Sequence, residues 1–153
     1  MPPVREIFPV PVDSLTLTAV CLEGITHLIL PGPPFPDDLQ AAGLLRRAAD
    51  LWDVDAVGLL LWNEKTLFMR PLVLVKGSET LVWETGCGSG SASIGAYRSR
   101  LAGEGTTVTE VHQPGGIIRV SADYHGSVPE NIRITGNVRF GPEKSLSAKE
   151  LLL

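Results

Sequence analysis

The chain has 153 residues, of which 44% are hydrophobic and 20% are charged, and its formal net charge is −4. These values fit one globular domain with a hydrophobic core. The acidic balance, without a sizeable basic cluster, argues against nucleic acid as a partner, and no apolar run approaches the roughly 20 residues of a membrane-spanning helix.

The first half of the chain predicts strands around one long helix. Residues 1–13 are rich in proline and are expected to be extended, whereas the proline-rich segment 31–36 must be a loop. Asp37 or Asp38 can cap a helix whose apolar residues repeat at helical spacing and which ends near Asp53. Runs of alternating or continuous apolar residues predict strands over 14–22, 25–30, 56–62, 66–75 and 79–83.

The most informative stretch is the glycine-rich segment 83–93, Trp-Glu-Thr-Gly-Cys-Gly-Ser-Gly-Ser-Ala-Ser. A β-compatible run leads into it, and a helix-compatible run from Ala92 to Leu101 follows and is ended by Gly103. The pattern therefore predicts a strand, then a tight turn that contains Cys87, then a helix that begins directly after the turn.

A cysteine at the start of a helix is a candidate reactive group. The first amides of a helix have no partner within it, and the positive end of the helix dipole favours the thiolate of Cys87. The same amides, on Gly88, Ser89 and Gly90, can hold a substrate carboxylate. Glu84 is either a surface carboxylate or an acid beside the thiol.

The second half of the chain continues with strands. They are predicted over 106–111 and 117–122, and the segment 131–140 predicts a last pair of short strands around Gly136. One long helix and one cysteine-led helix against a mixed or antiparallel sheet indicate an α+β fold. We divide the chain into an extended segment, a lobe and a tail, which cover 1–13, 14–142 and 143–153.

The cysteines and histidines bear on location and metal binding. The N-terminal residues lack the apolar region of a secretory signal, and the two cysteines do not form a Cys-x-x-Cys pair. We therefore expect a cytoplasmic protein with free thiols. The three histidines are scattered along the chain, and no metal site is expected from them.

Three landmarks point to a known family. They occur in order as Cys-Gly-Ser-Gly at 87–90, Pro-Gly-Gly at 114–116 and Ile-Arg-Ile-Thr-Gly at 132–136. Together they resemble the C-terminal lobe of the pyridoxal-phosphate-independent amino-acid racemases and epimerases, of which diaminopimelate epimerase is the best-known member. The resemblance covers roughly residues 15–142. Within the family, the segment 80–84 is similar to the histidine racemase branch, whose product feeds opine-type metallophores.

The resemblance implies one lobe of a two-lobe enzyme, with a sheet wrapped around the helix that follows Cys87 and the other helix outside. In the family, each lobe supplies one cysteine, the substrate lies between the lobes, and neither a cofactor nor a metal is used. One thiolate removes the Cα proton of the amino acid, and the other thiol delivers a proton to the opposite face. The expected substrate is a small amino acid, and the expected partner is a second lobe or a second copy of this chain.

The sequence departs from the family pattern because it contains one lobe. Cys87 matches the second-lobe cysteine, whereas Cys21 lies on the apolar face of a predicted strand and is expected to be a buried structural thiol. The family's Gly-Asn-Pro-His segment stands here as Gly-Ile-Thr-His at 24–27, so His27 matches and Ile25 replaces the substrate-binding asparagine. His27 is equally well explained as a hydrogen-bonded core residue. The Glu-Arg pair of diaminopimelate epimerase has no clear counterpart, which argues against diaminopimelate as the substrate.

Three functions fit these observations. The first is a racemase lobe in which Cys87 is one acid/base group. The second is a catalytically silent module that holds a small carboxylate at the helix N-terminus, with binding that survives Cys87→Ser. The third is a hydrolase or transferase that uses a Cys87–His27 pair. Rapid alkylation of Cys87 near neutral pH is expected for the first and third functions and not for the second.

Overall fold

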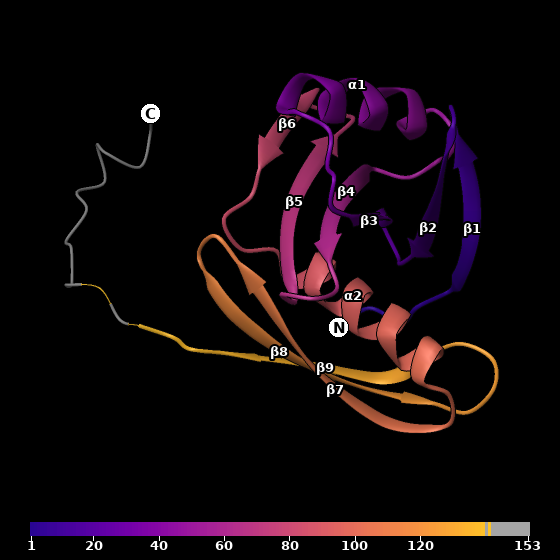
Figure 1. Ribbon diagram of the computed structural model, residues 1–153, viewed down its shortest axis with the longest axis vertical. Helices are drawn as coiled ribbons and strands as arrows, with labels where there is room; N and C mark the ends of the chain where they lie inside the picture. The colour runs from indigo at the N-terminus through magenta and orange to yellow at the C-terminus, as the bar shows by residue number, and fades with distance from the viewer. Residues whose placement is uncertain (140, 142–153) are drawn as a thin grey trace, which may run out of the picture.

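The computed structural model describes residues 1–139 and 141 (Figure 1). The tail predicted at 143–153 lies outside the described residues. Within them, strands and helices follow one another in the order βββ-α-βββ-α-βββ. The elements are β1 (Glu6–Val12), β2 (Leu15–Cys21), β3 (Ile25–Gly32), α1 (Asp38–Ala49), β4 (Ala56–Asn63), β5 (Phe68–Val75), β6 (Thr80–Trp83), α2 (Gly88–Ala102), β7 (Gly105–Gln113), β8 (Gly116–Tyr124) and β9 (Glu130–Gly136).

The strands of the described chain join one mixed sheet, and the predicted α+β class is confirmed. The strand order is β1-β2-β3-β4-β5-β7-β8-β9, and β6 pairs with β5 beside this path. Neighbouring strands are antiparallel except for β3–β4 and the contact between β5 and β7. That contact is the single pair Phe68 and His112, next to a hydrogen bond of 2.8 Å from His112 N to Leu67 O. The ribbon β7–β8–β9 therefore meets the other strands along a very short seam.

Two hydrophobic cores lie on opposite faces of the central strands β3 and β4. On one face, Leu28 and Leu59 pack with Leu45 of α1. On the other face, Ile29 and Leu60 belong to the core that surrounds α2. Strands buried on both faces appear in sequence as continuous apolar runs, and this explains why β3 and β4 lack alternation.

Helix α2 is enclosed by the sheet. It lies between the ribbon β7–β8–β9 and the central strands, whereas α1 lies on the outer face (Figure 1). Small residues along α2 allow this close packing. A Cβ added at Gly95 would lie 2.3 Å from Cγ1 of Val120 on β8, so only glycine fits without movement. The arrangement matches the expected epimerase-like lobe, with a sheet around the cysteine-led helix and one helix outside.

The start of α1 follows the sequence prediction, but its end does not. Asp37 is the N-cap: its carboxylate accepts from Gln40 N at 2.8 Å, and the Gln40 side chain accepts from Asp37 N at 3.1 Å. This reciprocal pair is a capping box. The helix ends at Ala49 rather than near Asp53, because the chain turns after Ala48, whose carbonyl accepts from Leu51 N at 3.0 Å.

Both ends of the sheet differ from the strand predictions. Within the segment expected only to be extended, Glu6–Val12 forms β1 and pairs along its length with β2. The predicted pair of strands around Gly136 is wrong, because one continuous strand, β9, runs antiparallel to β8 and ends at Gly136 opposite Ile118. In the part of the chain that the structure describes, neither helix has the length and apolar character needed to cross a bilayer.

Candidate functional site

Cys87 is the N-cap residue of α2, as the glycine-rich segment predicts. Its backbone is extended, with φ −123° and ψ 110°, and its Sγ accepts a hydrogen bond from Gly90 N at 3.3 Å. Sulfur thus takes the place of the side-chain oxygen that usually caps a helix. A Cβ at Gly90 would lie 3.1 Å from this sulfur and 3.1 Å from Leu60 Cδ2, and the glycine therefore gives the sulfur its space.

The thiol of Cys87 is almost fully buried, with 5% of the residue exposed. Burial raises its pKa to about 11, and a side-chain hydrogen bond with Glu84 adds to the rise. Hydrogen bonds from Ser89 and Gly90 lower the pKa, but burial has the larger effect. The prediction of a stabilised thiolate is therefore wrong for this lobe, which holds a protonated thiol at neutral pH. The choice between the two roles expected for Glu84 stays a prediction.

His27 and Ser89 form a hydrogen-bonded chain that ends at the sulfur. His27 on β3 is fully buried, and its Nε2 lies 3.0 Å from Ser89 Oγ. Ser89 Oγ lies 3.5 Å from Cys87 Sγ. His27 therefore contacts Ser89 and not the sulfur, so this geometry does not support the hydrolase or transferase hypothesis based on a direct Cys87–His27 pair.

The His27 ring is held neutral by its surroundings. Burial lowers its pKa to about 4. Its Nδ1 has no hydrogen-bond partner in the described structure and faces Gly58, the residue paired with His27 across the parallel strands β3 and β4. A Cβ at Gly58 would lie 2.3 Å from Nδ1, so the ring fits only above a glycine. With the ring proton on Nε2, His27 donates toward Ser89.

Two residues that the sequence analysis missed hold the backbone of Cys87. Gln113, at the end of β7, accepts a hydrogen bond from Cys87 N through Oε1 at 2.7 Å and donates through Nε2 to Ser91 Oγ at 2.8 Å. Ser91 Oγ in turn donates to Cys87 O at 2.7 Å. The sequence contains one indication of the role of Gln113, which is that this residue directly precedes the Pro-Gly-Gly landmark.

The Pro-Gly-Gly landmark touches the same loop. Gly115 N donates to Thr85 O at 2.6 Å, and a Cβ at Gly115 would lie 2.8 Å from that oxygen. The turn between β7 and β8 therefore contacts the cysteine loop at two points, one on each side of Gly86. The third landmark is close as well, because a Cβ at Gly88 would lie 3.3 Å from Ile134 Cδ1. The three sequence landmarks thus meet in space.

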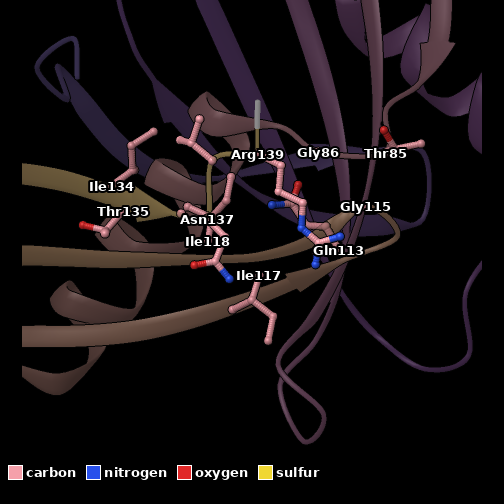
Figure 2. A pocket seen from close by; sticks show the side chains of 13 residues that line it. Thr85, Gly86, Gln113, Gly115, Ile117, Ile118, Ile134, Thr135, Asn137 and Arg139 are labelled. Atoms are coloured by element: carbon pink, nitrogen blue, oxygen red, sulfur yellow. The ribbon is translucent and has the colours of Figure 1, made fainter. Parts of the chain in front are cut away.

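A cavity of about 750 Å³ opens beside the loop. Figure 2 shows Thr85 and Gln113 toward one end and Ile134 toward the other, with Arg139 between them. Cys87 is not among the described residues that line the cavity. Its sequence neighbour Gly86 and its hydrogen-bond partner Gln113 do line it. The lining includes Thr85, Gly86, Gln113, Ile117, Ile118, Ile134 and Arg139.

The second cysteine is separate from this network. Cys21, at the end of β2, is partly exposed rather than buried, and it pairs in the sheet with Thr26. Both cysteines are free thiols. Among residues 1–139 and 141, no group of three His, Cys, Asp or Glu side chains is placed to hold a metal ion.

Comparison with known proteins identifies the family. The model of the family described as "Histidine racemase CntK N-terminal domain" matches residues 3–143. The chain belongs to this family. A histidine racemase of Staphylococcus aureus (strain Mu50 / ATCC 700699) is 27% identical over 128 residues, which are 80% of this chain and 47% of that protein. A histidine racemase of Fusobacterium nucleatum subsp. nucleatum (strain ATCC 23726 / VPI 4351) is 26% identical over 102 residues, 63% of this chain and 38% of that protein.

The match to the CntK N-terminal domain confirms the histidine racemase branch and corrects the lobe. The sequence landmarks resembled a C-terminal lobe, whereas the matching family model is that of an N-terminal domain. The physical reason is that the landmarks describe local geometry, a cysteine at the start of an enclosed helix, and this geometry does not by itself distinguish one lobe from another. The chain spans less than half the length of the two histidine racemases, at 47% and 38%.

Proposed function

We propose that this lobe forms one half of a cofactor-independent histidine racemase site, in which Cys87 is a proton donor to the substrate Cα. The observation that supports this most directly is the hydrogen-bonded chain His27–Ser89–Cys87 at the start of α2. It occurs in a chain whose family and relatives are histidine racemases. The reaction is inversion at Cα, and it needs one proton-transfer group on each face of the planar carbanion.

The protonation state of Cys87 favours the donor role. Because its pKa is about 11, the group enters the reaction as a thiol. In the step we propose, the S–H bond breaks and the proton forms a new bond to the carbanion, leaving a thiolate on Cys87. Gly90 N–H and the Ser89 hydroxyl, at 3.3 and 3.5 Å from the sulfur, are placed to donate to that thiolate. His27 then donates to Ser89, so charge developing on the sulfur meets preorganised donors.

Substrate recognition is proposed at the first turn of α2. Gly90 N–H is used by the sulfur, so Gly88 and Ser89 supply the remaining amides of the predicted carboxylate site. A helix N-terminus favours a carboxylate because its amides and its dipole both face the anion. Negative charge that spreads onto the carboxylate as the carbanion forms is stabilised there.

The second thiol must come from elsewhere, because Cys21 is not in the Cys87 network. A second lobe in the same protein or as a separate chain can supply it, as can a second copy of this chain. Because this chain spans less than half of each relative, the second lobe is the form we favour.

Two observations support a different function. The burial of Cys87 and its raised pKa also fit a catalytically silent lobe that only binds a small carboxylate. Such a lobe binds its ligand with a serine at position 87 as well as it does with cysteine, and it never exchanges the Cα proton.

The decisive measurement is Cα proton exchange. L-Histidine is incubated in deuterated water with the protein, alone and together with the remaining part of a histidine racemase chain, and deuterium at Cα and D-histidine are measured. We expect exchange when both lobes are present, and its loss in Cys87→Ser. Cys21→Ser is the matched control and retains exchange. Histidine binding without exchange in every combination would overturn the racemase proposal in favour of the silent lobe.

A further inference from the structure

The side chain of Gln113 spans the peptide groups on both sides of Cys87. Its Oε1 accepts from Cys87 N at 2.7 Å, and its Nε2 reaches Cys87 O through Ser91 Oγ, with distances of 2.8 and 2.7 Å. We infer that Gln113 is a positioning residue that fixes the backbone of Cys87 and thereby the direction and burial of its sulfur. This role in the reaction rests on the proposed function, whereas the role in holding the thiol does not.

The orientation of the Gln113 amide follows from its partners. The Cys87 main-chain N–H can only donate, so it faces the amide oxygen, and the amide NH2 group must then face Ser91. Gln113 is 6% exposed, so both bonds are shielded from water and are costly to lose. Three successive hydrogen bonds around one residue leave its extended N-cap conformation little freedom.

Gln113 connects the cavity to the loop that holds the sulfur. It is at the end of β7, 26 positions from Cys87 in sequence, and it is one of the residues that line the cavity (Figure 2). Without its amide, Cys87 N–H and the Ser91 hydroxyl lose a buried partner. Turning these two groups toward water then lowers the free energy of the loop. We expect the sulfur to become accessible with them.

Three variants separate this role from general destabilisation. Gln113→Leu keeps the bulk and removes both hydrogen bonds. Gln113→Glu keeps an acceptor for Cys87 N–H but loses the donor to Ser91, whose single hydroxyl proton can go to the new carboxylate or to Cys87 O but not to both. It also adds negative charge near the thiol. Thr109→Val is the matched control, since Thr109 lies on the same strand, is 3% exposed, and has a hydroxyl without a partner in the described structure.

The readout is the rate of iodoacetamide alkylation at Cys87 as a function of pH, measured by mass spectrometry, with Cys21 as the internal reference. We expect Gln113→Leu to raise the rate at pH 8 by at least about tenfold, the effect of lowering a thiol pKa by one unit. Gln113→Glu is expected to stay at or below the wild-type rate, and Thr109→Val to equal it. Equal rates in Gln113→Leu and Thr109→Val overturn the inference. If Gln113→Leu does not fold, Ser91→Ala breaks the carbonyl half alone, and an unchanged Cys87 rate in it counts equally against the inference.

A second readout concerns catalysis and uses the two-lobe protein. Gln113→Leu is expected to lower kcat for Cα exchange by about tenfold or more with little change in KM, because a misdirected thiol affects proton transfer more than binding. Gln113→Glu should restore part of kcat. If wild-type protein shows no exchange, the proposed function fails, and the alkylation rates still decide whether Gln113 holds Cys87. An unchanged kcat in Gln113→Leu contradicts the catalytic part of the inference.

Discussion

At the scale of single residues, the site is defined by how tightly its polar groups are enclosed. Cys87 and His27 are both buried, and burial moves both pKa values away from the charged form: the thiol pKa rises to about 11 and the imidazole pKa falls to about 4. Both groups are therefore neutral at pH 7. A site of neutral donors suits the delivery of a proton to a carbanion better than the storage of a resting thiolate.

His27 is expected to make the lobe less stable at acid pH. Because its folded pKa of about 4 lies below the ordinary value of 6.5, its contribution to stability is fully present above pH 6.5 and is lost as the pH falls toward 4. We expect the free energy of unfolding to fall by on the order of 3 kcal/mol over this range through His27 alone. Urea unfolding at pH 7 and pH 4.5 measures the change.

The comparison for this prediction is His27→Gln, which should show a much flatter profile between those pH values. The exposed His125→Gln variant is the control and is expected to follow the wild-type profile. A wild-type profile as flat as that of His27→Gln would contradict the assignment of a buried neutral imidazole.

At the scale of elements, α2 is held by close contact rather than by large side chains. Replacing Gly95 by alanine ordinarily favours a helix by about 1 kcal/mol. Here the new Cβ would lie 2.3 Å from Val120, so we expect Gly95→Ala to destabilise the lobe by roughly 1–3 kcal/mol. Thermal and urea denaturation measure the change.

Gly43→Ala on α1 is the matched control for this substitution. Its added Cβ meets only the flexible end of Arg47, at 3.1 Å, so the helix preference for alanine should dominate and stabilise the lobe by up to about 1 kcal/mol. If both variants change the free energy of unfolding in the same direction, the contact between Gly95 and Val120 does not decide the effect of the substitution at Gly95.

Much of the secondary structure could be predicted from local sequence, and the contacts around the thiol could not. The glycine-rich turn predicts Cys87 at the start of α2, and apolar runs predict the central strands, because both signals are local. The pairing of β3 with β4, which places Gly58 under His27, depends on sheet order. The bond from Cys87 to Gln113 joins positions 26 apart, and no local pattern contains it. The direction of the thiol pKa also depended on burial, which outweighed the local effect of the helix N-terminus.

At the scale of the whole molecule, the lobe lacks a second thiol in its network. We therefore expect no Cα exchange from dilute lobe alone, and a rate that rises to saturation as a separately produced second lobe is titrated in. Deuterium incorporation into L-histidine gives the rate, and a second lobe with its cysteine changed to serine is the control. A rate per lobe that grows with the concentration of this chain alone would instead indicate that two copies complete the site.

The short seam between β5 and β7 has a mechanical consequence. The three-stranded ribbon β7–β8–β9 pairs with the other strands at a single residue pair, and it is otherwise joined to them by the core around α2 and by hydrogen bonds to the cysteine loop. The tip of this ribbon contains Gln113 and Gly115, which form hydrogen bonds to the cysteine loop on either side of Gly86. A shift of this ribbon caused by a molecule bound against Ile117 or Ile118 would therefore reach the backbone of Cys87 through Gln113.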